Sequence, residues 1–222
     1  IQLPDYSLMD SYLHRGQRKK LIVHLRAENR FDAKVLDVMA NIPRHAFLES
    51  SFHAFAYQDE AFRIGCEQTI SQPSTVAWQT TELELLPRQH VLEIGTGSGY
   101  QAAVFSLLGG RVFTVERHKP LYQKAKLTLK KLRLDRIRCY LRDGSKGLPE
   151  MAPYDRILAT AWAAAVPPQL REQLKVGGIM IIPVGPDGKE QTMLKIRRIS
   201  ETKWTEEELG GCQFVPFLKG VE

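Results

Sequence analysis

Along the middle of the chain, apolar residues recur with two different spacings. From residue 77 onward, short apolar runs bounded by polar residues or glycine are separated by segments with helical spacing of apolar residues. A short apolar run fits a buried strand, and helical spacing fits an amphipathic helix. We therefore expect strands over 90–95, 111–116, 137–141, 154–161 and 178–185. Helices are expected over 77–86, 101–108, 119–132 and 167–174. This alternation predicts an α/β fold with a mostly parallel, doubly wound sheet covered on both faces.

The two ends of the chain do not follow this alternation of strands and helices. The first residues predict helices over 7–30 and 33–42, the second capped by Asp32, followed by a loop-rich segment with many aromatic residues. Near the other end, two apolar segments predict a pair of antiparallel strands over 191–199 and 210–218. We expect one domain over 1–222, made of an N-terminal helical extension (1–66), a central core (67–186) and C-terminal strands (187–222).

Composition narrows the class of protein. The 222 residues are 43% hydrophobic, which is enough for a sizeable core. Three cysteines (Cys66, Cys139 and Cys212) are odd in number and lack the spacing of metal ligands, so we expect no metal and a reducing compartment. No run of eighteen apolar residues occurs. We therefore expect a cytoplasmic protein that has no membrane partner.

The net charge of +6 raises the question of a nucleic-acid partner. The basic residues concentrate in segments 14–20 and 124–138. Aromatic residues are not interleaved with them as they would be on a surface that stacks bases. A basic surface that keeps the protein in solution is the simpler interpretation, and we do not expect nucleic acid to be the partner.

A glycine-rich loop follows the first expected strand of the core. The segment "VLEIGTGSGY" places Gly95, Gly97 and Gly99 between a strand and a helix. Glycine allows a sharp turn and a close approach of the backbone to a ligand beside a helix N-terminus. A dinucleotide-binding loop would need a further glycine at position 100, where Tyr100 stands, so the pattern disfavours NAD.

Carboxylates stand at the ends of the next two expected strands. Glu116 lies 21 positions after Gly95, where a carboxylate accepts hydrogen bonds from ribose hydroxyls. Asp143 and Gly144 follow the third strand. Taken alone, each of these acidic residues is typical of a solvent-exposed position at the end of a strand. Because the carboxyl ends of parallel strands share one edge of the sheet, the three signals together indicate a nucleoside pocket.

This arrangement resembles that of the Rossmann-like S-adenosylmethionine-dependent methyltransferases. The resemblance implies S-adenosyl-L-methionine as cofactor and S-adenosyl-L-homocysteine as product. It implies that Glu116 holds the ribose, with Arg117 beside it, and that Asp143 and Gly144 border the adenine. The loop that approaches the amino-acid part of the cofactor consists of Gly95, Thr96, Gly97, Ser98 and Gly99.

The segment after the fourth strand of the core bears on the methyl acceptor. It lacks the Asp/Asn-Pro-Pro-aromatic motif of enzymes that methylate base nitrogens, and no His, Asp, Glu or Lys stands between Thr160 and Pro168. A hydroxyl or amine acceptor usually has to lose a proton during transfer. A carboxylate, with a reference pKa of roughly 4, arrives ionised. Its attack on a sulfonium needs alignment and exclusion of water, which favours a carboxylate acceptor here.

Longer motifs resemble the protein-L-isoaspartate O-methyltransferase family over about residues 10–219. They are "QTISQP", "VLEIGTGSGYQAA", "QLKVGGIMIIPVG" and "FVPFLKG", with "VLDVMANIPRHAFL" upstream. The resemblance implies methyl transfer to the free carboxylate of isoaspartyl residues in damaged peptides and proteins. The methyl ester recloses to a succinimide, and hydrolysis then returns some normal aspartate. It also implies a cytosolic monomer.

The resemblance assigns roles to two further segments. The stretch 68–77 becomes a lid, with Thr69 and Ile70 along the cofactor. Ser71 matches the active-site serine, and we expect it to orient the acceptor carboxylate, since no histidine is placed to activate it as a nucleophile. A turn hydroxyl before Pro73 is the plain alternative for Ser71. The segment beside the peptide channel is Val215, Pro216 and Phe217, for which an edge strand is a compatible interpretation.

One segment departs from the family pattern. Trp162-Ala163-Ala164 stands where the family usually has a small residue, alanine and proline. The ring of Trp162 would then pack as a lid or narrow the acceptor pocket. Two other functions stay open: a methyltransferase that acts on RNA, suggested by the positive charge, and a non-catalytic protein that binds S-adenosylmethionine.

Overall fold

The computed structural model describes residues 5–6, 9–186, 189–218 and 220–222. Positions 7 and 8 of the first expected helix, and positions 187, 188 and 219 of the expected C-terminal region, lie outside the described residues. Among the described residues, every helix is too short or too polar to cross a membrane.

A seven-stranded sheet forms the centre of the described structure, in the order β5-β4-β3-β6-β7-β8-β9. The first five strands in this order are parallel, and β8 and β9 add antiparallel to the edge beside β7. The chain turns to opposite sides of β3 to form β4 and β6, and this is where ligands of open α/β sheets bind. The strands are β3 (His90–Ile94), β4 (Arg111–Glu116), β5 (Arg138–Leu141), β6 (Tyr154–Ala159), β7 (Leu174–Val184), β8 (Gln191–Arg198) and β9 (Trp204–Cys212).

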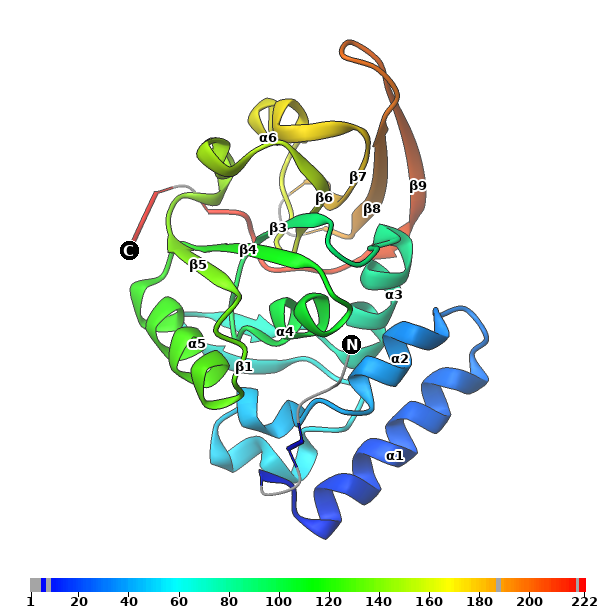
Figure 1. Cartoon of the computed structure of the whole chain (residues 1–222), viewed down its shortest axis with the longest axis vertical. Helices are drawn as coiled ribbons and strands as arrows, with labels where there is room; N and C mark the ends of the chain where they lie inside the picture. Colours follow the sequence, from blue (N-terminus) through cyan, green and yellow to red (C-terminus); the bar gives the residue numbers. More distant parts are fainter. Residues whose placement is uncertain (1–4, 7–8, 187–188, 219) are drawn as a thin grey trace.

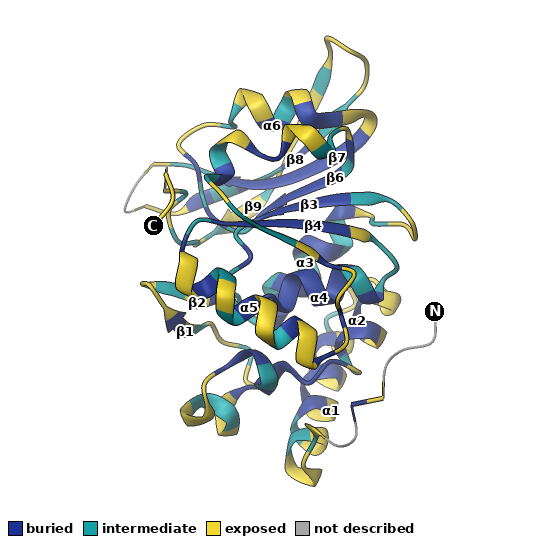
Figure 2. Ribbon diagram, turned by 60° about the vertical axis from the view of Figure 1, so that its left-hand side comes forward, coloured by how far each residue is buried: buried dark blue, intermediate teal, exposed yellow. Residues whose placement is uncertain are grey.

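Alternate side chains of the central strands feed two separate hydrophobic cores. Val91 on β3 belongs to the larger core, whereas its neighbours Leu92 and Ile94 belong to the smaller one on the other face. This alternation is the period of two that a β-strand imposes. The larger core lies under α3 (Pro73–Leu83), α4 (Tyr100–Leu107) and α5 (Lys119–Lys131), and the smaller one under α6 (Pro168–Gln173). Figure 2 shows the buried strands between these two layers.

The N-terminal extension forms a third layer outside α3, α4 and α5 (Figure 1). It consists of α1 (Tyr12–Ala27), α2 (Ala33–Met39), the short 3-10 helices η2 (Arg44–Phe47) and η3 (Ser50–Phe55), and a hairpin of β1 (Phe62–Gly65) and β2 (Gln68–Ile70). Asp32 caps α2 as expected, its side chain accepting from Lys34 N–H. The described part of the first helix is shorter than expected, because the Ser11 hydroxyl caps its start and Asn29 takes a left-handed conformation just beyond its end.

Expected boundaries in the core and near the C-terminus were also wrong. Helix α3 begins at Pro73 and not at residue 77, because proline suits the first turn of a helix. Strand β7 follows α6 directly, and the Gly177–Gly178 pair lies in a bulge of the strand between the residues that pair with Tyr154 and Arg156. Strand β9 ends at Cys212, so residues 213–218 do not continue the edge strand.

Residues 213–218 instead cross the carboxyl ends of the parallel strands, as the red segment in Figure 1 shows. The backbone of Trp162 holds this crossing. Its N–H donates to Val215 O at 2.9 Å, and its carbonyl accepts from Phe217 N–H at 2.8 Å. The C-terminal segment thereby covers the edge of the sheet where the expected site residues lie.

Candidate active site

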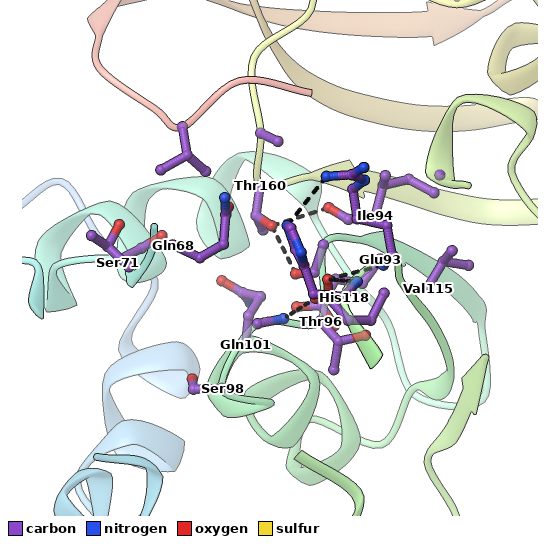
Figure 3. A pocket seen from close by; sticks show the side chains of 18 of the residues that line it. Gln68, Ser71, Glu93, Ile94, Thr96, Ser98, Gln101, Val115, His118 and Thr160 are labelled. Carbon is purple, nitrogen blue, oxygen red and sulfur yellow. Dashed lines mark hydrogen bonds between the residues drawn. The ribbon is translucent and has the colours of Figure 1, made fainter. Parts of the chain in front are cut away.

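A cavity of about 800 Å³ opens at the carboxyl ends of β3, β4 and β6 (Figure 3). We name it the glycine-loop cavity. It brings together nearly all residues expected from the sequence: Thr69, Ile70, Ser71, Gly95, Thr96, Gly97, Ser98, Glu116, Arg117, Gly144, Val215, Pro216 and Phe217. Gly99 and Asp143 are not part of its lining.

The glycine loop takes a backbone path that other residues would strain. Gly95, Gly97 and Gly99 all have positive φ angles, of 96°, 52° and 89°. A Cβ on Gly95 would also clash with Thr160 Oγ1, which donates to the carbonyls of Ile94 and Gly95. The loop therefore needs glycine for its turn and for its contact with the end of β6. Gly99 begins α4 and packs on α5 instead of facing the cavity.

Glu116 acts as a backbone clamp at the end of β4. Its Oε2 accepts from Gly97 N–H at 2.8 Å, and its Oε1 accepts from the N–H groups of Arg117 and His118 at 2.9 Å. A carboxylate has about four lone-pair positions, so these three bonds leave room for one more donor. Glu116 lines the cavity and is 4% exposed. It therefore shapes the glycine loop even before a ligand adds a hydroxyl.

Asp143 turns toward the chain terminus. Its Oδ1 accepts from the N–H and hydroxyl of Ser145, and its Oδ2 accepts from Gly220 N–H at 2.9 Å. Partial burial raises the pKa of Asp143, but these hydrogen bonds outweigh burial and hold that pKa below its usual value. The neighbouring Gly144 lines the cavity, and a Cβ there would touch Ile94 and approach the ring of Phe217. Asp143 thus fixes the turn that brings Gly144 to the cavity.

Two residues that line the glycine-loop cavity, Glu93 and Gln101, each have a buried acceptor oxygen without a partner among the described residues. Glu93 on β3 is fully buried, and its Oε2 accepts from the Thr114 hydroxyl at 2.5 Å, while its Oε1 has no described partner. Gln101 donates its Nε2 to Thr80 Oγ1 at 2.9 Å, while its Oε1 likewise has none. Burial, with a smaller contribution from Glu116, raises the pKa of Glu93 to about 8. Unpartnered buried acceptors suit a ligand that donates hydrogen bonds, such as an ammonium group.

A second cavity of about 600 Å³ adjoins the first, and we name it the side cavity. Thr69, Ser71, Thr160 and Val215 line both cavities, so the two spaces meet at these residues. The remaining lining of the side cavity is Ala61, Gln72, Thr75, Gln213 and Phe214. Within the described part of the chain this lining carries hydroxyls and amides but no charged side chain. The side cavity therefore offers hydrogen bonds without acid–base chemistry.

The stretch 68–77 is a junction between elements. It passes from β2 through Ser71 and Gln72 into α3. In Figure 3 Ser71 and Gln68 lie on one side of the glycine-loop cavity, and Glu93, Thr96 and His118 lie on the other. Ser71 is half-buried and faces both cavities, as a residue that orients an acceptor would.

Comparison with known proteins decides the family. The model of the family "Protein-L-isoaspartate(D-aspartate) O-methyltransferase (PCMT)" matches residues 16–222. The chain belongs to this family. A protein-L-isoaspartate O-methyltransferase of Cytophaga hutchinsonii is 53% identical over 94% of each chain. One of Rhodospirillum centenum is 48% identical over 93% of each chain.

Solved structures of the family have the same fold. One of them, a protein-L-isoaspartate O-methyltransferase, superposes with a TM-score of 0.82 at 29% identity, over 90% of this chain and 65% of the other, so this chain spans about two thirds of that protein. Another, from Plasmodium falciparum, was solved in complex with S-adenosyl-L-homocysteine. It superposes with a TM-score of 0.81 at 22% identity, over 91% of this chain and 99% of the other.

Several residues that line the glycine-loop cavity were missed from the sequence. Glu93 looked like part of a strand, although a lone acid inside a buried apolar run is a signal of a special environment. Gln101, Tyr100, His118 and Thr160 also line the glycine-loop cavity. Tyr100 and His118 stand next to Gly99 and Arg117, which the motifs did mark, whereas Gln101 and Thr160 are not adjacent to any marked residue.

Trp162 departs from the family pattern without entering the site. Its side chain is half-buried and is absent from the described lining of both cavities. Its backbone N–H and carbonyl are hydrogen-bonded to Val215 and Phe217, and these bonds hold the C-terminal segment across the carboxyl ends of the strands. The expectation that the ring narrows the acceptor pocket therefore has no support in this lining.

The described residues include one group with metal-ligand geometry, in the N-terminal extension. Asp10, His14 and His45 bring three candidate ligand atoms within 4.8 Å of one another. The carboxylate of Asp10, however, is held by both terminal nitrogens of Arg18, and the nitrogens of His45 are bonded to Tyr57 Oη and Met9 O. The rings of His14 and His45 are stacked, so their lone pairs do not converge on one ion. We assign no metal to this group.

Proposed function

We propose that this chain transfers a methyl group from S-adenosyl-L-methionine to the free carboxylate of isoaspartyl residues in damaged peptides and proteins, which initiates their repair. One observation carries the proposal: a cavity with a glycine loop and carboxylates meets a cavity with only neutral hydrogen-bonding groups, at Ser71 and three neighbours. Membership of the family supports the same activity.

The residues of the glycine-loop cavity fit the donor. Gly95, Gly97 and Gly144 present backbone without a side chain in the lining of the cavity, and Glu116 keeps one lone-pair position for a ribose hydroxyl. The free oxygens of Glu93 and Gln101 suit the ammonium of the amino-acid part. Bound S-adenosyl-L-methionine supplies an electrophilic methyl group, and its sulfur keeps the bonding electron pair when the acceptor oxygen takes that methyl.

The residues of the side cavity fit an acceptor that is already ionised. Its described lining has no histidine, lysine, aspartate or glutamate to remove a proton. Hydroxyls and amides at Ser71, Gln72 and Gln213 hold a carboxylate without protonating it. We assign Ser71 to orienting the acceptor oxygen toward the methyl group, because alignment and exclusion of water are what this step requires.

The test is transfer of labelled methyl to an isoaspartyl peptide and to the same peptide with normal aspartate. We expect labelling of the isoaspartyl peptide alone, and equal or absent labelling of both would refute the proposal. Bulk RNA as a third acceptor addresses the RNA alternative, for which the described lining of the side cavity offers no lysine or arginine. Binding of S-adenosyl-L-homocysteine without transfer to any acceptor would identify a non-catalytic binding protein.

We further propose that the chain acts as a monomer in the cytoplasm. The free thiols of Cys66, Cys139 and Cys212 support a reducing compartment. Size-exclusion chromatography with light scattering measures the mass in solution, and a dimer would contradict the monomer.

A further inference from the structure

Arg44 is a fully buried cation that the function proposed above does not yet use. It lies in η2 and is 1% exposed. Its Nε donates to Ala56 O at 3.0 Å and its Nη2 donates to Ser71 O at 2.8 Å. Its Nη1 is buried without a hydrogen-bond partner among the described residues. The guanidinium thus reaches Ser71 from behind the wall where the two cavities meet.

The charge of Arg44 has no carboxylate in ion-pair contact within the described part of the chain. The fold does supply such partners to other buried cations. Arg18 pairs with Asp10 at 2.5 Å, and Lys195 pairs with Glu82 at 2.8 Å. A buried charge without a partner is costly. Arg156 is also buried and bonded only to backbone carbonyls, so the missing ion pair alone does not set Arg44 apart. What sets Arg44 apart is its bond to Ser71 O together with a buried Nη1 that has no partner among the described residues.

The surroundings of Arg44 leave its charge in place. Its guanidinium lies 4.8 Å from the centre of the Tyr100 ring. Burial lowers the pKa of Arg44, and Tyr100, Asp59 and Tyr57 oppose that shift. Asp59 is the one acid among these, and its Oδ1 is bonded to Ser74 N–H. A guanidinium keeps its proton at neutral pH in proteins, so a positive charge stands directly behind Ser71.

The two cavities therefore differ in the charge that surrounds them. The glycine-loop cavity has charged and titratable groups in its lining, namely Glu93, Glu116 and Arg117. The side cavity has no charged residue in its described lining, and the nearest cation that the contacts show is Arg44, which is bonded to the carbonyl of Ser71 where the two cavities meet. In a poorly solvated interior a fixed charge acts over a longer range than it does in water.

We propose that Arg44 is a positioning residue that makes the side cavity select an anionic acceptor. This rests on the proposed function, since it explains how a site without a charged lining prefers a carboxylate. The guanidinium fixes the Ser71 carbonyl through its Nη2–H, and its charge supplies the positive potential that a carboxylate senses and an amide does not. A neutral acceptor of the same shape gains the hydrogen bonds but not the charge.

The experiment compares two peptides on the enzyme saturated with S-adenosyl-L-homocysteine. One carries an isoaspartyl carboxylate, and the other carries the corresponding isoasparaginyl carboxamide, which is its neutral isostere. The ratio of their dissociation constants measures selection by charge. We expect the wild-type enzyme to favour the carboxylate by about tenfold or more. Because the charge is buried, this ratio should change little between low and high salt, and its collapse at high salt would assign the selection to surface charges.

Three variants separate charge from structure. Arg44→Met should bring the ratio of dissociation constants to within about twofold of one. Arg44→Lys should keep most of the ratio, because the lysine amine keeps the positive charge, but it should lower turnover, because lysine lacks the planar set of N–H donors of arginine. Arg156→Met is the matched control. Arg156 is also buried and bonded to backbone carbonyls, those of Glu84 and Asp155, but it lies on β6 away from both cavities. We expect this variant to leave the ratio unchanged.

An unchanged ratio in folded Arg44→Met would overturn the inference. If Arg44→Met does not fold, a ratio in Arg44→Lys that falls to one would overturn it equally. Failure of the inference is distinct from failure of the proposed function. In the first case the wild-type enzyme still methylates the isoaspartyl peptide and not the aspartyl peptide, whereas in the second it does not.

Discussion

The glycine-loop cavity takes half of its lining from one continuous stretch of the chain, whereas the side cavity is assembled entirely from short segments far apart in sequence. Residues 93–118 supply half of the lining of the first cavity, from β3 through the glycine loop to the residues just after β4, and the other half comes from 68–76, 144, 160–161 and 215–218. The second takes its lining from 61–75, from Thr160 and from 213–215, and Arg44 is bonded to the carbonyl of Ser71. In our proposal, a local motif therefore contributes much of the donor site, whereas the acceptor site depends on long-range packing.

The two cavities also differ in chemistry. The glycine-loop cavity contains carboxylates, among them Glu93 and Glu116. The described lining of the side cavity is neutral. Changes on one side should therefore alter donor affinity, and changes on the other should alter turnover or acceptor selection. A variant that alters both together would show that the two sides are not separable.

The largest effect is expected for Glu116→Ala. This change removes the acceptor for three backbone N–H groups and, in our proposal, for the ribose. A hydrogen bond to a charged group is worth roughly 1.5–3 kcal/mol, so the affinity for S-adenosyl-L-homocysteine should fall about 100-fold or more. Titration calorimetry measures it, with thermal unfolding as the check on folding. A loss below about threefold would show that the clamp is not part of donor binding.

The next effect is expected for Ser71→Ala on the acceptor side. Turnover of the isoaspartyl peptide should fall roughly 10- to 100-fold because the acceptor oxygen loses its orientation. Affinity for S-adenosyl-L-homocysteine should stay within about threefold, even though Ser71 touches both cavities. Steady-state kinetics and calorimetry on the same preparation measure the two. If only cofactor affinity were lost, Ser71 would belong to the donor side.

A smaller effect is expected from pH through Glu93. With a pKa of about 8 it is mostly protonated at neutral pH, and an ammonium ligand favours the ionised form. Affinity for S-adenosyl-L-homocysteine should therefore rise with pH, by roughly tenfold between pH 6.5 and 7.5, and the complex should release a proton as it forms. Calorimetry in buffers of different ionisation enthalpy detects that proton.

Glu93→Gln is the control for this pH dependence. The amide keeps an acceptor oxygen but cannot ionise, so affinity in the variant should vary little with pH. An equal slope in the variant and the wild-type protein would place the titrating group elsewhere.

The smallest effect is expected for Trp162→Ala. The ring is absent from the described lining of both cavities, and the backbone bonds to Val215 and Phe217 survive the change. The KM for the isoaspartyl peptide and kcat should both stay within about threefold of wild type. A tenfold rise in KM would show that this departure from the family pattern does shape the acceptor site.

The same contrast explains how much of the site could be predicted. Gly95, Glu116 and Gly144 stand at strand ends that periodicity located, so their meeting at one edge of the sheet followed from the fold. Arg44 could not be found in this way, because its contacts join it to Ala56 and Ser71, which belong to other segments. A buried arginine and an exposed one look alike in a sequence.

The fold shows the same limit in its edge elements. The parallel strands were predicted because they are buried on both faces and read as apolar runs. Strand β9 was placed too late in the chain, because its first residues include Glu206, Glu207 and Glu208 on an exposed edge. The bulge of β7 was not predicted from the sequence, because a Gly177–Gly178 pair that closely follows an expected helix is typical of the end of that helix.

The most direct test of this account is a crystal structure with S-adenosyl-L-homocysteine and an isoaspartyl peptide bound together. We predict the nucleoside in the glycine-loop cavity with its ribose on Glu116, and the isoaspartyl carboxylate at Ser71 in the side cavity. The acceptor oxygen should face the sulfur across the boundary formed by Thr69 and Thr160. A nucleoside away from Glu116, or a peptide carboxylate that never reaches Ser71, would contradict the account.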